Sequence, residues 1–263
     1  MLGAIIGDIV GSRFEFSPNN DSKFELFTPE CNFTDDTICT VAIADAILHG
    51  KDYRQSLLDW CRRYLSPMGG YGSMFAQWLQ SDDPQPYNSC GNGSAMRVSS
   101  VGWLFDNIYK VIEEAEKTAA VTHNHVEGIR GARCIATAIF NLRTCHASKD
   151  SLLNNIEKHY PYAIPTLEEV NRIGRSGHFD AVCQETVPMA LRCFLDSDDF
   201  ESAIRLAVMA GGDTDTKGAI TGSLAEAFYD IPEEMADKAY EYLPEEMIDV
   251  VRQFYERVAY NLE

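Results

Sequence analysis

The chain has little positive charge. Its 263 residues include 22 Lys and Arg against 40 Asp and Glu, which gives a formal net charge of −18 at pH 7. A nucleic-acid groove or a surface for anionic membranes needs clustered Lys and Arg, so we expect neither. An anionic ligand would have to be held by metal ions, helix N-termini and backbone N–H groups instead.

Long apolar runs are also missing. The opening segment 2–10 is apolar but short, Asp8 interrupts it, and no basic residue precedes it. It therefore fits neither a signal peptide nor a membrane span, and we expect a cytoplasmic protein with no membrane partner. The eight cysteines form neither a CxxC pair nor a disulfide framework, so we expect reduced and mostly buried thiols.

Strand alternation is nearly absent, whereas helical spacing of apolar residues recurs along the chain. That spacing is clear in the segments 38–46, 126–139 and 220–228. Further helices are predicted at 55–64, 96–105, 108–121, 152–159, 200–210 and 233–260. No repeat or low-complexity linker divides the chain, and 45% hydrophobic residues suffice for a substantial core. We therefore predict a single all-α domain spanning 1–263.

Two short acidic strings each stand directly before a predicted helix. They are Thr34-Asp35-Asp36-Thr37 and Asp213-Thr214-Asp215-Thr216. Carboxylates and hydroxyls are hard oxygen ligands, and neither string has Cys or His at zinc spacing, so Mg²⁺ or Mn²⁺ is favoured over Ca²⁺. The four aspartates would balance two divalent cations, as in a binuclear site.

The alternative is that each string only starts a helix, because Thr or Asp at an N-cap with acids in the first turn satisfies free N–H groups. A cap needs one oxygen, whereas each string supplies several. The pair Gly211-Gly212 before the second string also allows the sharp turn that brings backbone close to a ligand. Two matching strings therefore favour the two halves of one metal site.

Gly218 and Gly222, in the helix after the second string, are four residues apart and share one helix face. Each Gly costs about 1 kcal/mol relative to Ala in a helix interior, so a packing reason is expected. We predict that a second helix presses closely against this face and holds the two acidic strings near each other in the core.

Three further features have a functional and an ordinary interpretation. Glu15 lies where a helical run meets a polar loop, and such an acid is most often on the surface. The segment 89–94 suits a backbone nest for phosphate oxygens, or it is a loop with a capping Ser. His123 and His125 stand between two predicted helices, where they are either solvated or in contact with a ligand.

Five segments, in their order along the chain, resemble the ADP-ribosylglycohydrolase family, whose founding member reactivates dinitrogenase reductase. They are GDIVGSRFE, FTDDT, SCGNGSAMRV, THNHVEGIRGA and GGDTDTKGAI, and the resemblance extends from Gly3 to about Pro232. It implies a compact all-α bundle with a central binuclear metal site. It also implies hydrolysis of the bond between ADP-ribose and a modified protein side chain, with arginine favoured over serine as the acceptor.

The resemblance also implies a role for individual residues. Two Mg²⁺ or Mn²⁺ ions would be held by Thr34, Asp35, Asp36, Asp213, Asp215 and Thr216. Glu15 matches the acid that gates this centre, and Glu15 or Asp36 would act as general base. ADP-ribose would be contacted by Asp35, Ser89, Cys90, Gly91, Asn92, Gly93 and His123. The expected partner is an ADP-ribosylated protein or another ADP-ribose derivative.

Two other functions remain open. One is a non-catalytic ADP-ribose binder or structural member of the same family, which the presence of Glu15 and all six implied ligands disfavours. The other is a two-metal phosphohydrolase that would cut the diphosphate and release AMP. Identification of the product separates the second alternative from glycoside hydrolysis.

Overall fold

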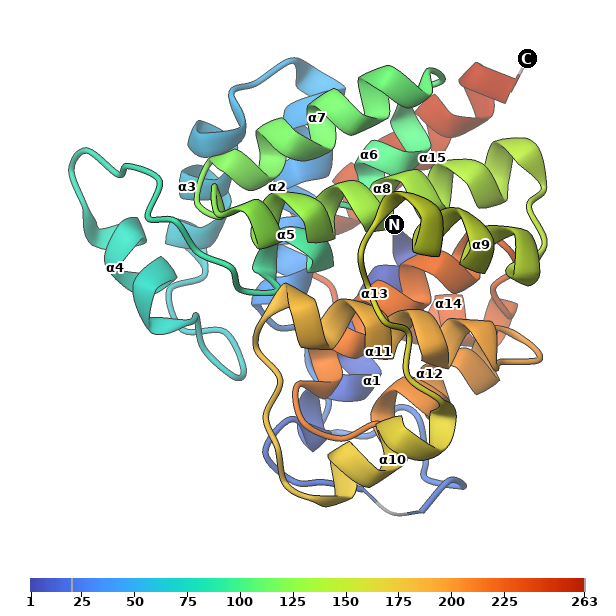
Figure 1. Cartoon of the computed structure of the whole chain (residues 1–263). Coiled ribbons are helices and arrows are strands. Elements are labelled where there is room, and N and C mark those ends of the chain that lie inside the picture. The colour runs from blue at the N-terminus through green and yellow to red at the C-terminus, as the bar shows by residue number, and fades with distance from the viewer. Residues whose placement is uncertain (20, 263) are drawn as a thin grey trace.

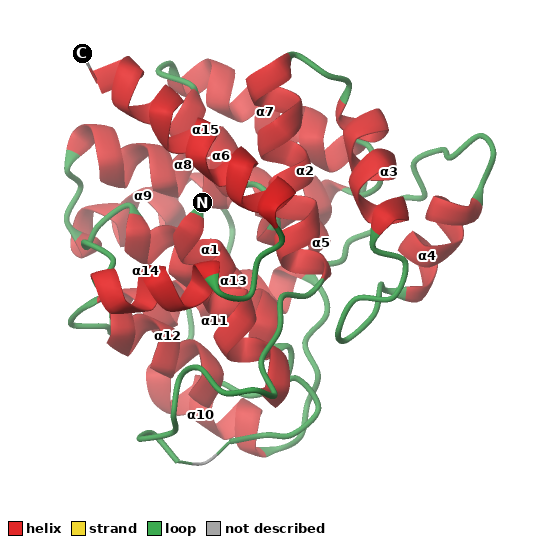
Figure 2. Cartoon of the chain, turned by 180° about the vertical axis from the view of Figure 1, so that it is seen from behind, coloured by secondary structure: helices red, strands yellow, loops and turns green. Residues whose placement is uncertain are grey.

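The computed structural model describes residues 1–19 and 21–262, and it consists of helices and their connections (Figure 1, Figure 2). Within these residues, β pairing is confined to two isolated bridges, Thr34 with Met68 and Gly91 with Val182. The predicted all-α class is confirmed. The helices are α1 (Leu2–Gly11), η1 (Ser12–Phe14), α2 (Asp35–His49), α3 (Tyr53–Arg63), α4 (Ser73–Gln80), α5 (Gly93–Met96), α6 (Ser99–Leu104), α7 (Ile108–Ala120), α8 (Val126–Cys145), α9 (Lys149–His159), α10 (Leu167–Arg175), α11 (Cys183–Leu195), α12 (Phe200–Met209), α13 (Thr214–Glu226), α14 (Glu233–Tyr240) and α15 (Glu245–Leu262).

Helices α1 and α13 pack against each other inside the bundle, and every residue of both is buried (Figure 1). Their backbones touch at glycines on both sides. A Cβ on Gly7 would lie 1.9 Å from the Gly218 carbonyl oxygen, and one on Gly222 would lie 2.0 Å from the Gly3 oxygen. The predicted close packing at Gly218 and Gly222 is therefore confirmed, and α1 is the partner helix.

This contact also fixes where the second acidic string begins. The Thr214 hydroxyl donates a hydrogen bond to the Gly11 carbonyl oxygen at 2.8 Å, at the C-terminal end of α1. A Cβ on Gly11 would lie 2.4 Å from the Thr214 carbonyl oxygen. The chain that leaves α1 through η1 therefore passes beside the start of α13, and it brings Glu15 to the same place.

Helix α2 begins and ends with ordinary local signals. The Thr34 hydroxyl caps it by accepting from the Asp36 N–H at 3.2 Å, and Gly50 ends it at φ 64°, in the left-handed region that favours glycine. The helix-start interpretation of the first string is thus correct as far as Thr34 is concerned. It does not account for the carboxylates that follow.

The sequence patterns miss some helices and merge others. Helices α4, α10 and α11 are not predicted, and α11 contains Pro188 in its interior, which normally argues against a helix. The predicted helix 233–260 is two helices, α14 and α15, because Pro244 restricts the residue before it to extended backbone. The predicted helix 96–105 likewise begins only at Ser99, after the single turn of α5.

Most apolar side chains gather in one core that extends from α1 to α15, and a smaller cluster lies under α10. Helix α4 and its flanking loops project from one side of this body in both views (Figure 1, Figure 2). None of the helices in the described residues is long and apolar enough to cross a membrane. The domain bounds 1–263 stay a prediction.

Candidate metal and substrate site

A cavity of about 300 Å³ opens at the starts of α2 and α13. Its lining includes all the acids singled out from the sequence, namely Glu15, Asp35, Asp36, Asp213 and Asp215. The two strings also touch directly, because the Thr216 hydroxyl donates a hydrogen bond to Asp36 Oδ2 at 3.2 Å across 180 residues of chain. The structure therefore brings the two acidic strings together, as the metal-site hypothesis requires.

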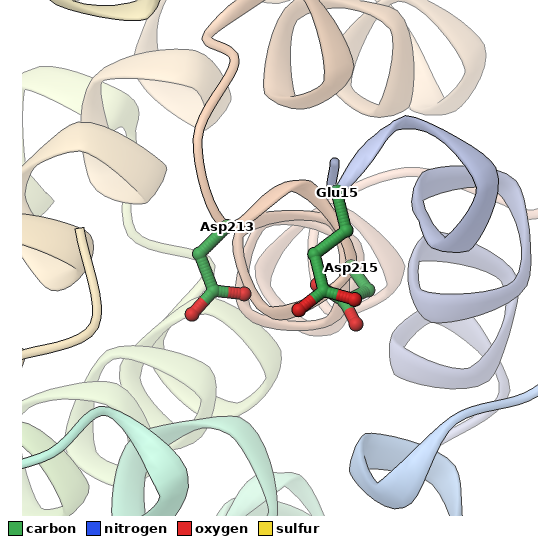
Figure 3. A group of neighbouring side chains, drawn as sticks. All are labelled: Glu15, Asp213 and Asp215. Carbon is green, nitrogen blue, oxygen red and sulfur yellow. The ribbon is translucent and has the colours of Figure 1, made fainter. Parts of the chain in front are cut away.

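Glu15, Asp213 and Asp215 form the tightest group of acids in the cavity. Each offers one carboxylate oxygen, and these oxygens lie within 4.8 Å of one another. Figure 3 shows the three carboxylates facing one space, Glu15 from the chain after α1 and the two aspartates from the start of α13. We expected Glu15 only as a gate or a base, and its position also makes it a possible metal ligand.

Asp8, which was not predicted as a site residue, holds the first string in place. It is fully buried in α1. Its Oδ1 accepts from the Thr34 hydroxyl at 2.7 Å, and its Oδ2 accepts from the N–H groups of Thr34 and Thr37, each at 3.0 Å, and from the Thr37 hydroxyl at 2.5 Å. Burial raises the pKa of Asp8 to about 6, although these hydrogen bonds oppose the rise. The signal in the sequence was an acid inside an apolar run, which must find buried partners.

Five of the six implied ligands line the cavity, and Thr34 does not. Its hydroxyl donates to Asp8 and accepts from the Asp36 N–H, so one lone pair is left for another contact. Thr34 is therefore the least accessible member of the implied ligand set. Through its hydrogen bonds, Thr34 connects α1 with the start of α2.

The carboxylates of this cavity destabilise one another's charged forms. Burial, and next the neighbouring acids, raise the pKa of Asp36 and Asp215 well above the usual range. Burial, then Asp213 and Asp8, raise the pKa of Glu15 to about 7. Such repulsion is the condition that a bound divalent cation relieves, because the cation is the largest charge in its site.

Two carboxylate oxygens are free to bind a cation. Asp36 Oδ1 and Glu15 Oε2 are buried and have no hydrogen-bond partner among the described residues. A buried acceptor without a partner is costly, and hard oxygen atoms are what Mg²⁺ and Mn²⁺ prefer. The residues present therefore fit a hard divalent metal.

The backbone of the loop before α13 and the side-chain amide of Asn92 together set the position of the Asp213 carboxylate. Gly211 and Gly212 both adopt positive φ, 61° and 62°, as the sharp turn predicted here requires. The Asp213 carboxylate then accepts from Asn92 Nδ2 at 2.7 Å. Asn92 Nδ2 also contacts the Thr186 hydroxyl at 3.0 Å. Asn92, which we expected to contact the substrate, thus also positions an implied metal ligand.

The predicted ADP-ribose segment lies against the cavity except at one residue. Ser89, Gly91, Asn92 and Gly93 line it, whereas Cys90 does not, and the Cys90 carbonyl accepts from the Cys183 N–H at 3.0 Å. The N–H of Gly91 donates to the Ser89 hydroxyl and that of Asn92 to the Ala181 carbonyl oxygen, each at 3.1 Å. Among the N–H groups of 91–94, the first two are therefore occupied, and those of Gly93 and Ser94 are left for a phosphate.

His123 lines the same cavity and is buried, so the interpretation as a solvated loop residue is wrong. Its Nδ1 lies 2.7 Å from the Thr122 hydroxyl. Burial, and next the charge of Arg97, hold the pKa of His123 well below its usual range. The ring is therefore neutral at pH 7, and it can take part in hydrogen bonds without adding charge.

Several aromatic and apolar residues of the cavity were not predicted as site residues. Among them are Tyr87, Phe75, Met74, Met96 and Phe179. Phe179 stacks on Phe16, with ring centroids 5.8 Å apart and ring planes 6° from parallel. Phe16 is 70% exposed and Phe179 43%, so the pair forms an open apolar surface next to Glu15. The available signal was that Phe16 directly follows Glu15.

Comparisons with known proteins agree over nearly the whole chain. The sequence profile described as ADP-ribosylglycohydrolase matches residues 1–261. Human ADP-ribosylhydrolase ARH3 is 24% identical, over 98% of this chain and 92% of that protein. The ADP-ribosylarginine hydrolase Tri1 of Pseudomonas putida strain GB-1 is 26% identical, over 90% of this chain and 72% of that protein.

A solved structure described as an ADP-ribosylglycohydrolase-related protein complex has the same fold. It superposes with a TM-score of 0.72 at 25% sequence identity, covering 98% of this chain and 95% of that chain. The chain therefore belongs to the ADP-ribosylglycohydrolase family, and it is an enzyme of the glycosyl hydrolase kind.

Proposed function

We propose that this protein is cytoplasmic and that it removes ADP-ribose from a modified arginine side chain of another protein, in a reaction that needs two Mg²⁺ or Mn²⁺ ions. The ions are held by Thr34, Asp35, Asp36, Asp213, Asp215 and Thr216. One observation supports this most strongly: both acidic strings and Glu15 share one cavity, and two of its buried carboxylate oxygens lack a partner among the described residues.

The bound ions would supply Lewis-acid chemistry, which orients ribose hydroxyls and lowers the pKa of a water molecule. Glu15 then takes the proton of the attacking water at Oε2, which is buried and has no partner among the described residues. Burial, the first cause of the raised pKa of Glu15, favours uptake of a proton by this carboxylate. Asp36 is the second candidate for the general base, because its Oδ1 is also buried and has no partner among the described residues.

The rest of the cavity positions the substrate. Asp35 lines it and is partly exposed, so its carboxylate can accept a hydrogen bond from a ribose hydroxyl. The N–H groups of Gly93 and Ser94 are the remaining nest donors for the diphosphate, and the neutral His123 ring lies beside Gly93. The charge that develops at the anomeric carbon as the glycosidic bond breaks is positive, so the surrounding carboxylates favour it.

The stacked pair Phe16 and Phe179 favours arginine over serine as the acceptor. A guanidinium is planar, keeps its charge at all relevant pH values, and stacks on aromatic rings. The pair is exposed beside Glu15, where the leaving side chain of a bound substrate would emerge. The net charge of −18 also attracts a cationic acceptor.

Product identification tests this function. The protein is incubated with Mg²⁺ or Mn²⁺ and with matched peptides ADP-ribosylated on arginine or on serine, and the products are identified by mass spectrometry. The proposal predicts free ADP-ribose and the unmodified arginine peptide. AMP as the product would identify a phosphohydrolase, and ADP-ribose binding without any product would identify a non-catalytic binder.

A further inference from the structure

Lys217 has no part in the mechanism above, although it directly follows the last implied metal ligand. Its side chain is 0% exposed, and its Nζ donates to Asp180 Oδ1 at 2.5 Å, where the Asp180 side chain is 1% exposed. Removing two charges from water is costly, and a well-packed apolar pair of the same size is often at least as stable. An ion pair this deep therefore calls for a reason other than stability.

The ion pair lies against the backbone that presents Asp213. A Cβ on Gly212 would lie 2.3 Å from Asp180 Oδ1 and 3.2 Å from Lys217 Nζ. The Asp213 N–H points at the same Asp180 oxygen, at 3.4 Å. The ion pair therefore packs directly against the positive-φ turn at Gly212, where any larger side chain would collide with it.

The same pair connects that loop to the wall of the cavity. Asp180 stands between Phe179 and Ala181, which both line the cavity. The Asp180 carbonyl oxygen accepts from the Thr186 hydroxyl at 2.9 Å, and Asn92 Nδ2 approaches it at 3.4 Å while it donates to Asp213. The wall segment, the Asn92 amide and the Asp213 loop thus meet at one buried point.

We infer that Lys217 and Asp180 are positioning residues for the metal centre: their ion pair fixes the Asp213 loop and the 179–181 wall against each other. This inference rests on the metal site of the proposed function. It names two residues that are not part of the cavity lining, and it concerns geometry rather than charge.

Geometry and charge predict opposite effects for one substitution. By charge alone, a lysine next to a cation site weakens metal binding, so Lys217→Met would tighten it. If Lys217 positions the Asp213 loop, the same substitution weakens metal binding. The apolar double variant Lys217→Met/Asp180→Leu keeps the net charge of the pair and removes its contacts, so a purely electrostatic role predicts no change.

The test is a calorimetric titration with Mn²⁺ alone, without substrate. Substitutions of residues that orient metal ligands typically weaken metal binding about 10- to 100-fold, and we expect a loss in this range for Lys217→Met and for the apolar double variant. Hydrogen exchange of the metal-free protein gives a second measurement. Peptides covering 177–182 and 210–217 should exchange faster in the double variant than in the wild type.

A core variant outside the cavity lining separates positioning from general loss of stability. Val251→Ala in α15 removes two buried methyl groups, and it should lower the melting temperature while leaving Mn²⁺ affinity within about twofold of the wild type. An equal loss of affinity in this control would overturn the inference. Wild-type Mn²⁺ affinity in the double variant would also overturn the inference, and so would tighter Mn²⁺ binding by Lys217→Met. If the double variant does not fold, the measurement on Lys217→Met alone decides between the two outcomes.

Different experimental results would refute the inference and the proposed function. If the wild type binds Mn²⁺ and the double variant does so weakly, but no ADP-ribosylated peptide is hydrolysed, the proposed function fails and the positioning role stands. If the wild type hydrolyses the arginine peptide and the double variant binds Mn²⁺ normally, only the positioning role fails.

Discussion

At the scale of single residues, the carboxylate of Glu15 has two possible uses, and its contacts distinguish it from a surface acid. It lies in the cavity with Asp213 and Asp215, its Oε2 is buried, and a Cβ on Gly69 would lie only 2.6 Å from that oxygen. The loop that contains Gly69 therefore covers the carboxylate. A residue in this position can gate the cavity and accept a proton in it.

Glu15→Gln should keep ADP-ribose binding and lose hydrolysis. The amide keeps the shape of the side chain but cannot take the proton of water, and loss of a general base typically costs about 10²- to 10⁴-fold. Binding is measured by calorimetry and turnover by release of ADP-ribose. The exposed acid Glu30 provides the control substitution Glu30→Gln, which should change neither. Near-normal turnover of Glu15→Gln would refute the role and make Asp36 the base.

Phe179→Leu should selectively slow the reaction of the arginine substrate. The substitution keeps an apolar wall and removes the ring, and a cation–π contact at such a site contributes about 0.5 to 2 kcal/mol, or about 2- to 30-fold in kcat/KM. The serine peptide should be affected less. Tyr109→Leu is the control, since Tyr109 is an exposed aromatic residue on α7, away from the cavity. Equal losses for both peptides would contradict an acceptor role of the aromatic pair.

His123 should make the metal-free protein sensitive to acid. Burial and Arg97 hold its folded pKa well below that of the unfolded chain, so its contribution to stability is full above about pH 6.5 and is lost as the pH falls toward the folded pKa. Between pH 6.5 and 5.5 the wild type should lose about 1 kcal/mol more than His123→Gln. The buried carboxylates with raised pKa values act in the opposite direction, but they are common to both proteins.

Urea unfolding with EDTA at the two pH values measures this difference. Equal pH dependence of the wild type and His123→Gln would mean that His123 takes up its proton in the folded state as easily as in the unfolded chain.

At the scale of elements, the contact of α1 with α13 is the one that places the site. Gly7→Ala should destabilise the fold, because the new methyl group would lie 1.9 Å from the Gly218 carbonyl oxygen and the helices would have to separate. Overpacking of this kind costs about 1 to 3 kcal/mol, occasionally more. Gly72→Ala is the control, since a Cβ there meets no atom of the described residues within 4 Å. A melting temperature of Gly7→Ala equal to that of the control would contradict this packing.

The elements also show what the sequence can predict. The apolar period of α2, α8 and α13 is set by residues close together in the sequence, and so are the acidic strings and the paired glycines of α13. All of these features could therefore be predicted from the sequence. Helix α11 was missed because packing overrides the penalty of Pro188. The ion pair of Lys217 and Asp180 joins residues 37 apart, and nothing in either local pattern points to the other.

At the scale of the whole molecule, the excess of acid is partly concentrated in the cavity, where burial and mutual repulsion raise pKa values. Mg²⁺ or Mn²⁺ should therefore stabilise the entire fold, by about 2.7 kcal/mol at 100 times the dissociation constant. The stabilisation should shrink as the pH falls from 7.5 to 5.5, because protons then compete with the metal for the same carboxylates.

Melting temperatures measured with and without the ion at each pH test this metal effect. Asp215→Asn is the control, since it removes ligand charge with little change in volume, and it should largely abolish the effect. A stabilisation that is equally large in Asp215→Asn, or that grows as the pH falls, would place the metal elsewhere.

The central claim is that the cavity between the two acidic strings hydrolyses the bond between ADP-ribose and a protein side chain with the help of metal ions. The most direct measurement is the rate of ADP-ribose release from an ADP-ribosylated arginine peptide, by mass spectrometry, for the wild type, Asp36→Asn and Asp215→Asn. We predict release by the wild type with Mg²⁺ or Mn²⁺, none with EDTA, and none by either variant, while both variants keep the helical circular dichroism of the wild type. Undiminished release with EDTA or by both variants would contradict the account.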